Sequence, residues 1–252
     1  MTILILETGA VPKRYNSPSF SQLFIREGNI DINKCDVINV TKYYYLGNPA
    51  KYSGYIVTGS ISMVTKRPIW STVLRLFLTR LIDANSPLLA VCYGHQLLAY
   101  ALGGRVDYHP LGKEQGTHTI RLRPEAKSHP LLSGLPESFP ANLSHSQAVL
   151  ELPKGARLLG GSDHDPHQIV AYGDSALSVQ FHPEFNKTVM LAFARTNMPD
   201  YPKNRRKPTI PVNLGLPIEE TPVASSILQR FVANLGASST SKGDLSPKGL
   251  YN

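Results

Sequence analysis

Cysteine is scarce in this sequence, since only Cys35 and Cys92 occur among its 252 residues. Two cysteines cannot build the disulfide framework of a small secreted domain, so a reduced, cytoplasmic setting is expected. Long apolar runs are also lacking: none approaches the roughly 20 residues needed to span a bilayer. The apolar start of the chain, residues 1–7, has neither a basic region nor a small-residue cleavage site. It therefore predicts a first strand rather than a signal peptide.

Acidic residues are outnumbered, with 18 Asp and Glu against 26 Lys and Arg, which gives a net charge of +8. Such an excess can indicate a nucleic-acid partner. The basic residues are scattered, however, and the one dense cluster, at 203–207, lies in a Pro-rich stretch without interleaved aromatic residues. A solvated basic surface explains this charge, and no nucleic-acid partner is expected. The histidines are not spaced as metal ligands, so no metal is expected either.

Short apolar runs alternate with segments of helical period in the first hundred residues. The apolar runs predict buried strands at 2–6, 36–40, 55–58 and 88–92. A first helix is predicted with Ser17 as its N-cap and Pro18 at its first position, ending at Glu27. Further helices are predicted at 68–84 and from Cys92 to the glycine pair 103–104. This alternation implies βαβ units and a mostly parallel sheet.

The second half of the chain has shorter strand-like runs, punctuated by turn residues. These predict antiparallel strands added beside the parallel sheet, at 117–122, 149–152, 157–160, 168–171 and 177–181. A helix at 186–196 closes a single domain over 1–198. A Pro-rich basic loop at 199–220, a C-terminal helix at 221–235 that packs on the domain, and a disordered tail at 236–252 complete the predicted organisation.

One candidate nucleophile is Cys92, in the run Ala-Val-Cys-Tyr-Gly-His-Gln at 90–96. A strand is predicted to run into Cys92, and a helix to begin directly after it. The helix N-terminus favours a thiolate, which is the reactive form of cysteine. The free N–H of Tyr93 could stabilise a developing oxyanion. A buried structural cysteine is the alternative reading of this segment.

A second candidate pair is His182 and Glu184, which follow the last predicted strand. In an extended chain this spacing places both side chains on one face, and Pro183 stiffens the segment. A carboxylate beside an imidazole fixes its tautomer and stabilises the imidazolium. Together with Cys92 the pair supplies a nucleophile, a base and an orienting group, at strand ends that can share one edge of the sheet.

Together these motifs resemble class I glutamine amidotransferases, the Cys-His-Glu type. The resemblance is carried by Cys-Tyr-Gly-His-Gln at 92–96, Gln-Phe-His-Pro-Glu-Phe at 180–185, Thr-Gly-Ser at 58–60 and Ser-His-Ser-Gln at 144–147. It covers roughly residues 1–198, and free-standing members similar to the amidotransferase part of GMP synthase look most alike. The resemblance implies a flavodoxin-like α/β fold, with a mostly parallel sheet flanked by helices and added antiparallel strands.

The resemblance also implies roles for individual residues. Cys92 would attack the γ-amide of glutamine or of a related γ-glutamyl compound and form a thioester, His182 would carry the proton, and Glu184 would orient His182. The oxyanion hole would consist of backbone N–H groups of Gly59, Ser60 and Tyr93, and Gln96 and His145 would contact the substrate. No cofactor is implied.

The sequence departs from the family pattern at two positions. Ala90 stands where the elbow usually begins with glycine, and Gln147 stands where many relatives have aspartate after the histidine. Three functions remain open: a glutaminase that passes ammonia to a separate synthetase subunit, a γ-glutamyl peptidase that acts on a small conjugate, and a catalytically quiet binding protein. The complete set of Cys92, His182 and Glu184 argues against the third.

Overall fold

A computed structural model describes residues 2–48, 50–196, 215 and 217–240, the side chains of 237–240 excepted. Strands and short 3-10 turns in this part of the chain are β1 (Ile3–Glu7), η1 (Lys13–Tyr15), η2 (Ile32–Lys34), β2 (Cys35–Asn39), β3 (Gly54–Val57), η3 (Val64–Lys66), β4 (Leu88–Val91), β5 (Arg105–Tyr108), β6 (Glu114–Leu122), η4 (Pro124–Ser128), β7 (Ser138–His145), β8 (Gln147–Glu151), β9 (Arg157–Gly161), β10 (Ile169–Tyr172) and β11 (Ala176–Val179). The helices are α1 (Phe20–Glu27), α2 (Ile69–Asp83), α3 (Tyr93–Ala101), α4 (Lys187–Thr196) and α5 (Pro222–Thr240).

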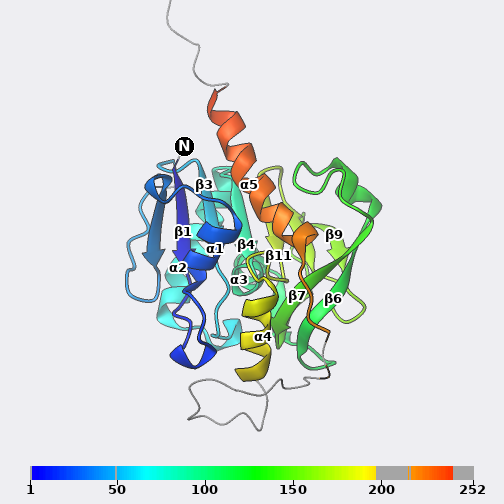
Figure 1. Cartoon of the computed structure of the whole chain (residues 1–252). Coiled ribbons are helices and arrows are strands. Elements are labelled where there is room, and N and C mark those ends of the chain that lie inside the picture. The colour runs from blue at the N-terminus through cyan, green and yellow to red at the C-terminus, as the bar shows by residue number, and fades with distance from the viewer. Residues whose placement is uncertain (1, 49, 197–214, 216, 241–252) are drawn as a thin grey trace, which may run out of the picture.

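The main sheet joins a parallel part to an antiparallel part. In the described chain its nine strands follow the order β2-β1-β3-β4-β11-β10-β9-β6-β7 (Figure 1). Strands β2, β1, β3, β4 and β11 pair in parallel, whereas β10, β9, β6 and β7 continue the sheet in antiparallel pairs. Strands β5 and β8 form a separate antiparallel pair. The predicted fold class, a mostly parallel sheet with added antiparallel strands, is confirmed.

Helices cover both faces of the sheet, and β1 shows why. Its alternate residues point to opposite faces, as strand geometry requires. Ile3 and Ile5 join a core cluster that contains Phe24 of α1 and Phe231 of α5. The neighbouring Leu4 and Leu6 join a second cluster, which contains residues of α2 and α3. Helices α1 and α5 therefore lie on one face and α2 and α3 on the other (Figure 1), so that β1 is buried on both sides.

The start of α1 differs from the prediction. Ser19, not Ser17, is the N-cap: the Gln22 N–H donates to Ser19 Oγ at 3.2 Å, and the Ser19 N–H donates to Gln22 Oε1 at 3.0 Å. This reciprocal capping box satisfies two N–H groups at the helix start. Ser17 instead donates its hydroxyl to the Pro18 carbonyl, and Pro18 lies outside the helix. The prediction of the N-cap was therefore wrong by two residues.

Strand β7 was not predicted, although it forms one edge of the main sheet. Its sequence, Ser-Phe-Pro-Ala-Asn-Leu-Ser-His, contains one proline and four polar residues, which weakens any strand signal. Pro140 is tolerated because an edge strand leaves part of its hydrogen-bonding capacity unused. The strand pairs with β6 over its whole length, from Ser138 opposite Arg121 to His145 opposite Glu114.

The C-terminal helix is longer than predicted. Helix α5 ends at Thr240 rather than at 235, so the first residues of the predicted disordered tail are helical. Ala224, Ile227 and Phe231 insert into the core cluster on the α1 face. The segment before α5 is fixed on β6, because the Thr117 N–H donates to the Pro217 carbonyl at 2.8 Å. The basic cluster at 203–207 and the tail from 241 lie outside the described residues.

Candidate active site

Cys92 lies at the carboxyl end of β4, beside the end of β11. The two strands pair in parallel with Val91 opposite Val179, and the Cys92 N–H donates to the Val179 carbonyl at 2.8 Å. The backbone of Cys92 has φ +51° and ψ −102°, a conformation that residues with a side chain rarely adopt. Such strain at a non-glycine residue is typical of a functional position, and here it turns the chain from strand to helix in one residue.

Helix α3 begins directly after this turn, with Tyr93 as its first residue. The first N–H groups of a helix have no partner within the helix, and its positive end favours an anion such as a thiolate. The helix approaches β3 closely at Gly94, where a Cβ would lie 2.8 Å from the Val57 carbonyl oxygen. Glycine at 94 is therefore required for the tight turn that presents Cys92.

His182 is held by Glu184 next to Cys92. The His182 Nδ1 lies 2.7 Å from Glu184 Oε1, and 4% and 0% of the two side chains are exposed. His182 and Cys92 line the same cavity, close enough for Cys92 to influence the pKa of His182. Because Nδ1 is occupied by Glu184, Nε2 is the nitrogen that remains available to exchange a proton. Burial alone would lower the pKa of His182, but the charges of Glu184 and Cys92 outweigh it and raise the pKa to about 10.

The backbone around His182 is fixed by Asn142 of β7. The His182 N–H donates to the Asn142 carbonyl at 2.8 Å, and Asn142 Nδ2 donates to the Phe185 carbonyl at 2.9 Å. Thr117 of β6 in turn donates to Asn142 Oδ1 at 2.7 Å. The ring of Phe185 stacks on His182 with 4.0 Å between centroids. No sequence pattern indicates the role of Asn142, because its partners come from segments far apart in the chain.

The loop after β3 lies against the same two side chains. A Cβ at Gly59 would be 2.8 Å from His182 Cε1 and 3.5 Å from Cys92 Cβ, so only glycine fits there. The Gly59 carbonyl accepts hydrogen bonds from the hydroxyls of Thr8 at 2.7 Å and Thr58 at 3.0 Å. In a trans peptide the next N–H points away from the carbonyl, so these bonds also fix the direction of the Ser60 N–H.

A cavity of about 170 Å³ opens beside these groups. Its lining includes the predicted site residues Cys92, His182, Ser60, Tyr93, Gln96 and His145. The structure thus brings together side chains that the sequence separates widely. Residues that were not predicted also line the cavity: Tyr15, Phe20, Ile61, Ser62, Met63, Lys113, Ser144, Ser146, Gln147 and Phe193.

Gln96 is oriented by two neighbours. Its Nε2 donates to the Gln147 carbonyl at 2.6 Å and to Gln180 Oε1 at 2.9 Å, which uses both amide hydrogens. The oxygen Oε1 is therefore the part of Gln96 that can accept a hydrogen bond from a bound molecule. Gln147, at the position where aspartate was noted in relatives, donates its own side-chain amide to the Thr65 hydroxyl at 2.6 Å.

His145 lines the cavity, but its nitrogens are both occupied. Nδ1 lies 2.9 Å from the Gln147 carbonyl oxygen, and Nε2 lies 2.8 Å from Glu114 Oε2. Both ring nitrogens are therefore engaged by groups of the protein. His145 can therefore meet a substrate only through its ring carbons, and its main contacts are with the protein.

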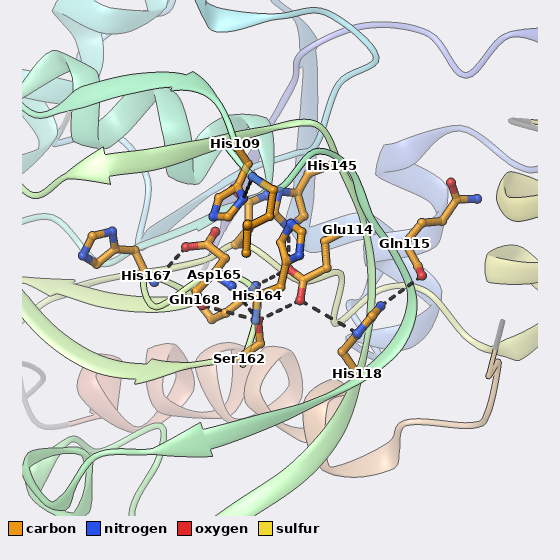
Figure 2. A network of polar contacts seen from close by, with 12 residues as sticks. His109, Glu114, Gln115, His118, His145, Ser162, His164, Asp165, His167 and Gln168 are labelled. Carbon is orange, nitrogen blue, oxygen red and sulfur yellow. Dashed lines mark hydrogen bonds and ion pairs between the residues drawn. The ribbon is translucent and has the colours of Figure 1, made fainter.

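Glu114 is the centre of a buried polar network (Figure 2). Besides His145, it accepts hydrogen bonds from Ser162 Oγ at 2.7 Å and Gln168 Nε2 at 2.8 Å. Burial would raise the pKa of Glu114, but the bond to His145 lowers it below its usual value. Sequence reasoning missed Glu114, because an acidic residue at the start of a strand resembles an ordinary surface residue.

Two kinds of site do not occur in the described part of the chain. No group of three or more His, Cys, Asp or Glu side chains there could hold a metal ion. None of its helices is long and apolar enough to cross a membrane.

The fold and the site have the architecture of an α/β enzyme with a cysteine at a strand-to-helix turn. The family model described as "Glutamine amidotransferase class-I" matches residues 24–195, and the chain belongs to this family. Two solved glutamine amidotransferase structures share the fold. That from Thermotoga maritima is 17% identical with a TM-score of 0.69, covering 93% of this chain and 97% of its own. The structure from Methylobacillus flagellatus is 18% identical with a TM-score of 0.69, and the match covers 100% of this chain and 98% of that one.

Curated relatives match shorter parts of the chain. "Gamma-glutamyl peptidase 5" of Arabidopsis thaliana is 32% identical over 142 residues, which are 56% of this chain and 57% of the relative. "Gamma-glutamyl peptidase 4" of the same plant is 34% identical over 144 residues, with the same coverage. "GMP synthase [glutamine-hydrolyzing]" of Thermosipho africanus is 36% identical over 109 residues, 43% of this chain and 20% of the relative. The chain thus matches little more than half the length of the peptidases.

Proposed function

We propose that this protein hydrolyses the γ-amide of glutamine or of a related γ-glutamyl compound through a thioester on Cys92. The observation that carries the proposal is the shared cavity of Cys92, on its strained turn, and His182, whose Nδ1 is 2.7 Å from Glu184 Oε1. A nucleophile, a base and a carboxylate that orients the base are the parts that acyl transfer requires. Family membership supports the same chemistry.

In the first step the Cys92 sulfur attacks the amide carbon, and the carbonyl oxygen becomes an oxyanion. The N–H groups of Tyr93, at the start of α3, and of the Gly59–Ser60 loop are the proposed donors to that oxyanion. Removal of one such donor costs about 3 kcal/mol of transition-state stabilisation in other enzymes. The C–N bond then breaks, and the amine leaves with the proton that His182 carries.

In the second step a water molecule attacks the thioester. His182, now neutral, removes a proton from that water, and the C–S bond breaks to release the γ-carboxylic acid and Cys92. The pKa of about 10 for His182 in the resting site means that the proton is on the imidazole before substrate binds. No group beyond the chain and water is needed for either step. A free thiol at Cys92 fits the reducing conditions of the cytoplasm, which is the proposed location.

The test compares amide hydrolysis by the wild type with that by Cys92→Ala and Cys92→Ser, using release of ammonia from glutamine and of amine from γ-glutamyl amides. Both variants should lose turnover, and wild type with hydroxylamine should yield the γ-glutamyl hydroxamate by capture of the thioester. Circular dichroism shows whether the variants remain folded. Unchanged turnover in folded Cys92→Ala would disprove the mechanism.

Two more specific functions follow from the relatives. The γ-glutamyl peptidases support a protein that acts alone on a small γ-glutamyl compound, and the GMP synthases support one that passes ammonia to a separate synthetase subunit. Turnover by the purified chain, without any added protein, favours the first. Glutamine turnover that rises on addition of a co-purified synthetase favours the second.

A further inference from the structure

A continuous row of aromatic rings leads from His182 into the cavity. Phe185 stacks on His182 with 4.0 Å between centroids and 12° between planes, and Phe193 follows at 4.7 Å from Phe185. The ring centroid of Phe193 lies 4.4 Å from that of Tyr15, which stacks on it, and 6.2 Å from that of Phe20. Phe185 is 0% exposed. Tyr15, Phe20 and Phe193 are also buried, at 5%, 2% and 5% exposure, and the surface that they keep lines the cavity together with Cys92 and His182.

The rings come from three elements that meet at this point. Tyr15 is the last residue of η1, Phe20 the first of α1, and Phe193 lies on α4. They belong to a small cluster that is separate from the two large core clusters of the sheet. The rings therefore form an apolar wall at the cavity, built outside the main core.

The rest of the cavity has a different character. Gln96 of α3 and the residues at the β7–β8 turn, Ser144 to Gln147, supply amide, hydroxyl and carbonyl groups. Such groups suit the polar backbone end of a γ-glutamyl compound. The rings of the aromatic wall present apolar faces, with the hydroxyl of Tyr15 as their one polar group, and their counterpart in a ligand should be apolar.

The wall lies on the His182 side of the cavity, because Phe193 is linked to His182 through the ring of Phe185. The amine must come within hydrogen-bond reach of His182, which protonates it, and the ring row begins on His182 itself. Ammonia has no apolar surface that could use such a wall. An amine that carries a ring or an alkyl chain would pack on Phe193, Tyr15 and Phe20 and gain the free energy of burying that surface.

We propose that Tyr15, Phe20 and Phe193 form a leaving-group subsite, and that the substrates are γ-glutamyl amides of apolar, ring-bearing amines rather than glutamine. This inference rests on the proposed function, since it assigns the part of the substrate on the amine side of the same Cys92 thioester. The C–N bond of the amide breaks, the amine takes the proton from His182, and water later supplies the oxygen of the released acid.

The test uses γ-glutamyl benzylamide and γ-glutamyl methylamide. Because benzylamine is the less basic amine and leaves more readily, the decisive comparison is how the preference changes between wild type and variants. Amine release is measured by chromatography, and the result is the ratio of kcat/KM for the two amides. Wild type should prefer the benzylamide by roughly tenfold or more, the scale of discrimination in an apolar pocket. Glutamine should be turned over no faster than the methylamide.

Variants of Phe193 test the assignment to the aromatic wall. Phe193→Ala should lower the benzyl-to-methyl ratio by roughly tenfold, and Phe193→Leu, which keeps an apolar side chain and the fold, should lower it less. Phe77→Leu is the matched control, because Phe77 is also buried but lies on α2 and does not line the cavity. Its ratio should equal that of the wild type.

The possible outcomes separate the two proposals. A wild-type ratio near one, or a ratio that the Phe193 variants leave unchanged, overturns the leaving-group subsite while turnover that depends on Cys92 still supports the hydrolase. Absence of any turnover that depends on Cys92, for glutamine and both amides alike, overturns the proposed function together with the inference that rests on it.

Discussion

Glu114 and His145 form an ion pair that is closed to solvent: Glu114 Oε2 lies 2.8 Å from His145 Nε2, and 0% and 1% of the two side chains are exposed. The other ring nitrogen of His145, Nδ1, is hydrogen-bonded to the Gln147 carbonyl oxygen. The same carbonyl oxygen accepts a hydrogen bond from Gln96 Nε2. A buried charge pair thus supports the polar part of the cavity. Buried pairs contribute little when compared with apolar packing, but removal of one partner is costly.

Substitution Glu114→Gln should therefore destabilise the protein by about 3 kcal/mol at neutral pH, measured by urea unfolding. The folded-state pKa of Glu114 is lowered, so its contribution is present above its usual value of 4.5 and is lost as pH falls below that value. The difference between variant and wild type should shrink accordingly in acid. As a control, Glu137→Gln should change stability by less than about 0.5 kcal/mol, because Glu137 pairs with Lys127 on the surface. A constant difference from neutral pH to pH 4 would contradict this account.

Substitution Glu184→Gln should move the alkaline limb of the activity profile to lower pH. Glu184 is the largest influence that raises the pKa of His182, so without its charge the imidazolium is lost at a lower pH than about 10. Protonated His182 is present below its pKa and disappears as pH rises through it, which fixes the direction of the shift. The pH dependence of kcat/KM measures it, and an NMR titration of His182 gives an independent reading. An alkaline limb at the same pH in both proteins would show that Glu184 does not set the charge of His182.

Substitution Gly59→Ala should displace the imidazole, because the new Cβ would lie 2.8 Å from His182 Cε1. A displacement on the order of 1 Å at a reacting group can cost about a hundredfold in rate, so kcat should fall on that scale. Gly160→Ala is the matched control, because Gly160 lies on β9 and its new Cβ would be 3.1 Å from Arg121 O and from Ile169 Cδ1. This variant should have a lower melting temperature and an unchanged kcat. Equal kcat in Gly59→Ala and wild type would exclude tight packing of this loop on His182.

Substitution Thr117→Val should weaken the support of the His182 segment. Thr117 donates its hydroxyl to Asn142 Oδ1 at 2.7 Å and accepts the Glu219 N–H at 2.9 Å. Valine has the same shape but leaves both groups unpaired, which should cost about 1–3 kcal/mol each in the free energy of unfolding. Thr117→Ser keeps the hydroxyl and should retain most of the stability. If the two variants were equally stable, the methyl group rather than the hydroxyl would be the important part of Thr117.

The sequence predicted the parts of the site that are encoded locally. The turn at Cys92 and the pair His182–Glu184 each lie within a few residues of a strand end, and parallel pairing of β4 with β11 brings them together. Their roles in the reaction stay predictions, as do those of Gly59, Ser60, Tyr93, Gln96 and His145. Strand β7 was not predicted, because Pro140 and its polar neighbours interrupt the alternation of apolar and polar residues that indicates a strand.

Glu114 and the aromatic wall could not be predicted for a different physical reason. The role of Glu114 depends on its hydrogen bonds to three residues that the antiparallel strands bring to it. These are His145 at the end of β7, Ser162 directly after β9 and Gln168 directly before β10. Phe193 has the spacing of an ordinary buried position on a helix, and nothing in the sequence places it near His182. Contacts that join distant segments depend on the arrangement of the whole sheet.

The direct pairing of β4 with β11 has a consequence for how this protein could change. The separation of Cys92 and His182 is fixed by hydrogen bonds between neighbouring strands, whereas the cavity-lining rings of Tyr15, Phe20 and Phe193 lie on η1, α1 and α4. Replacements at these three positions can therefore alter which molecules pack in the cavity while the spacing of sulfur and imidazole stays the same. Reactivity and selectivity are in this way carried by separate portions of one chain and are open to independent redesign.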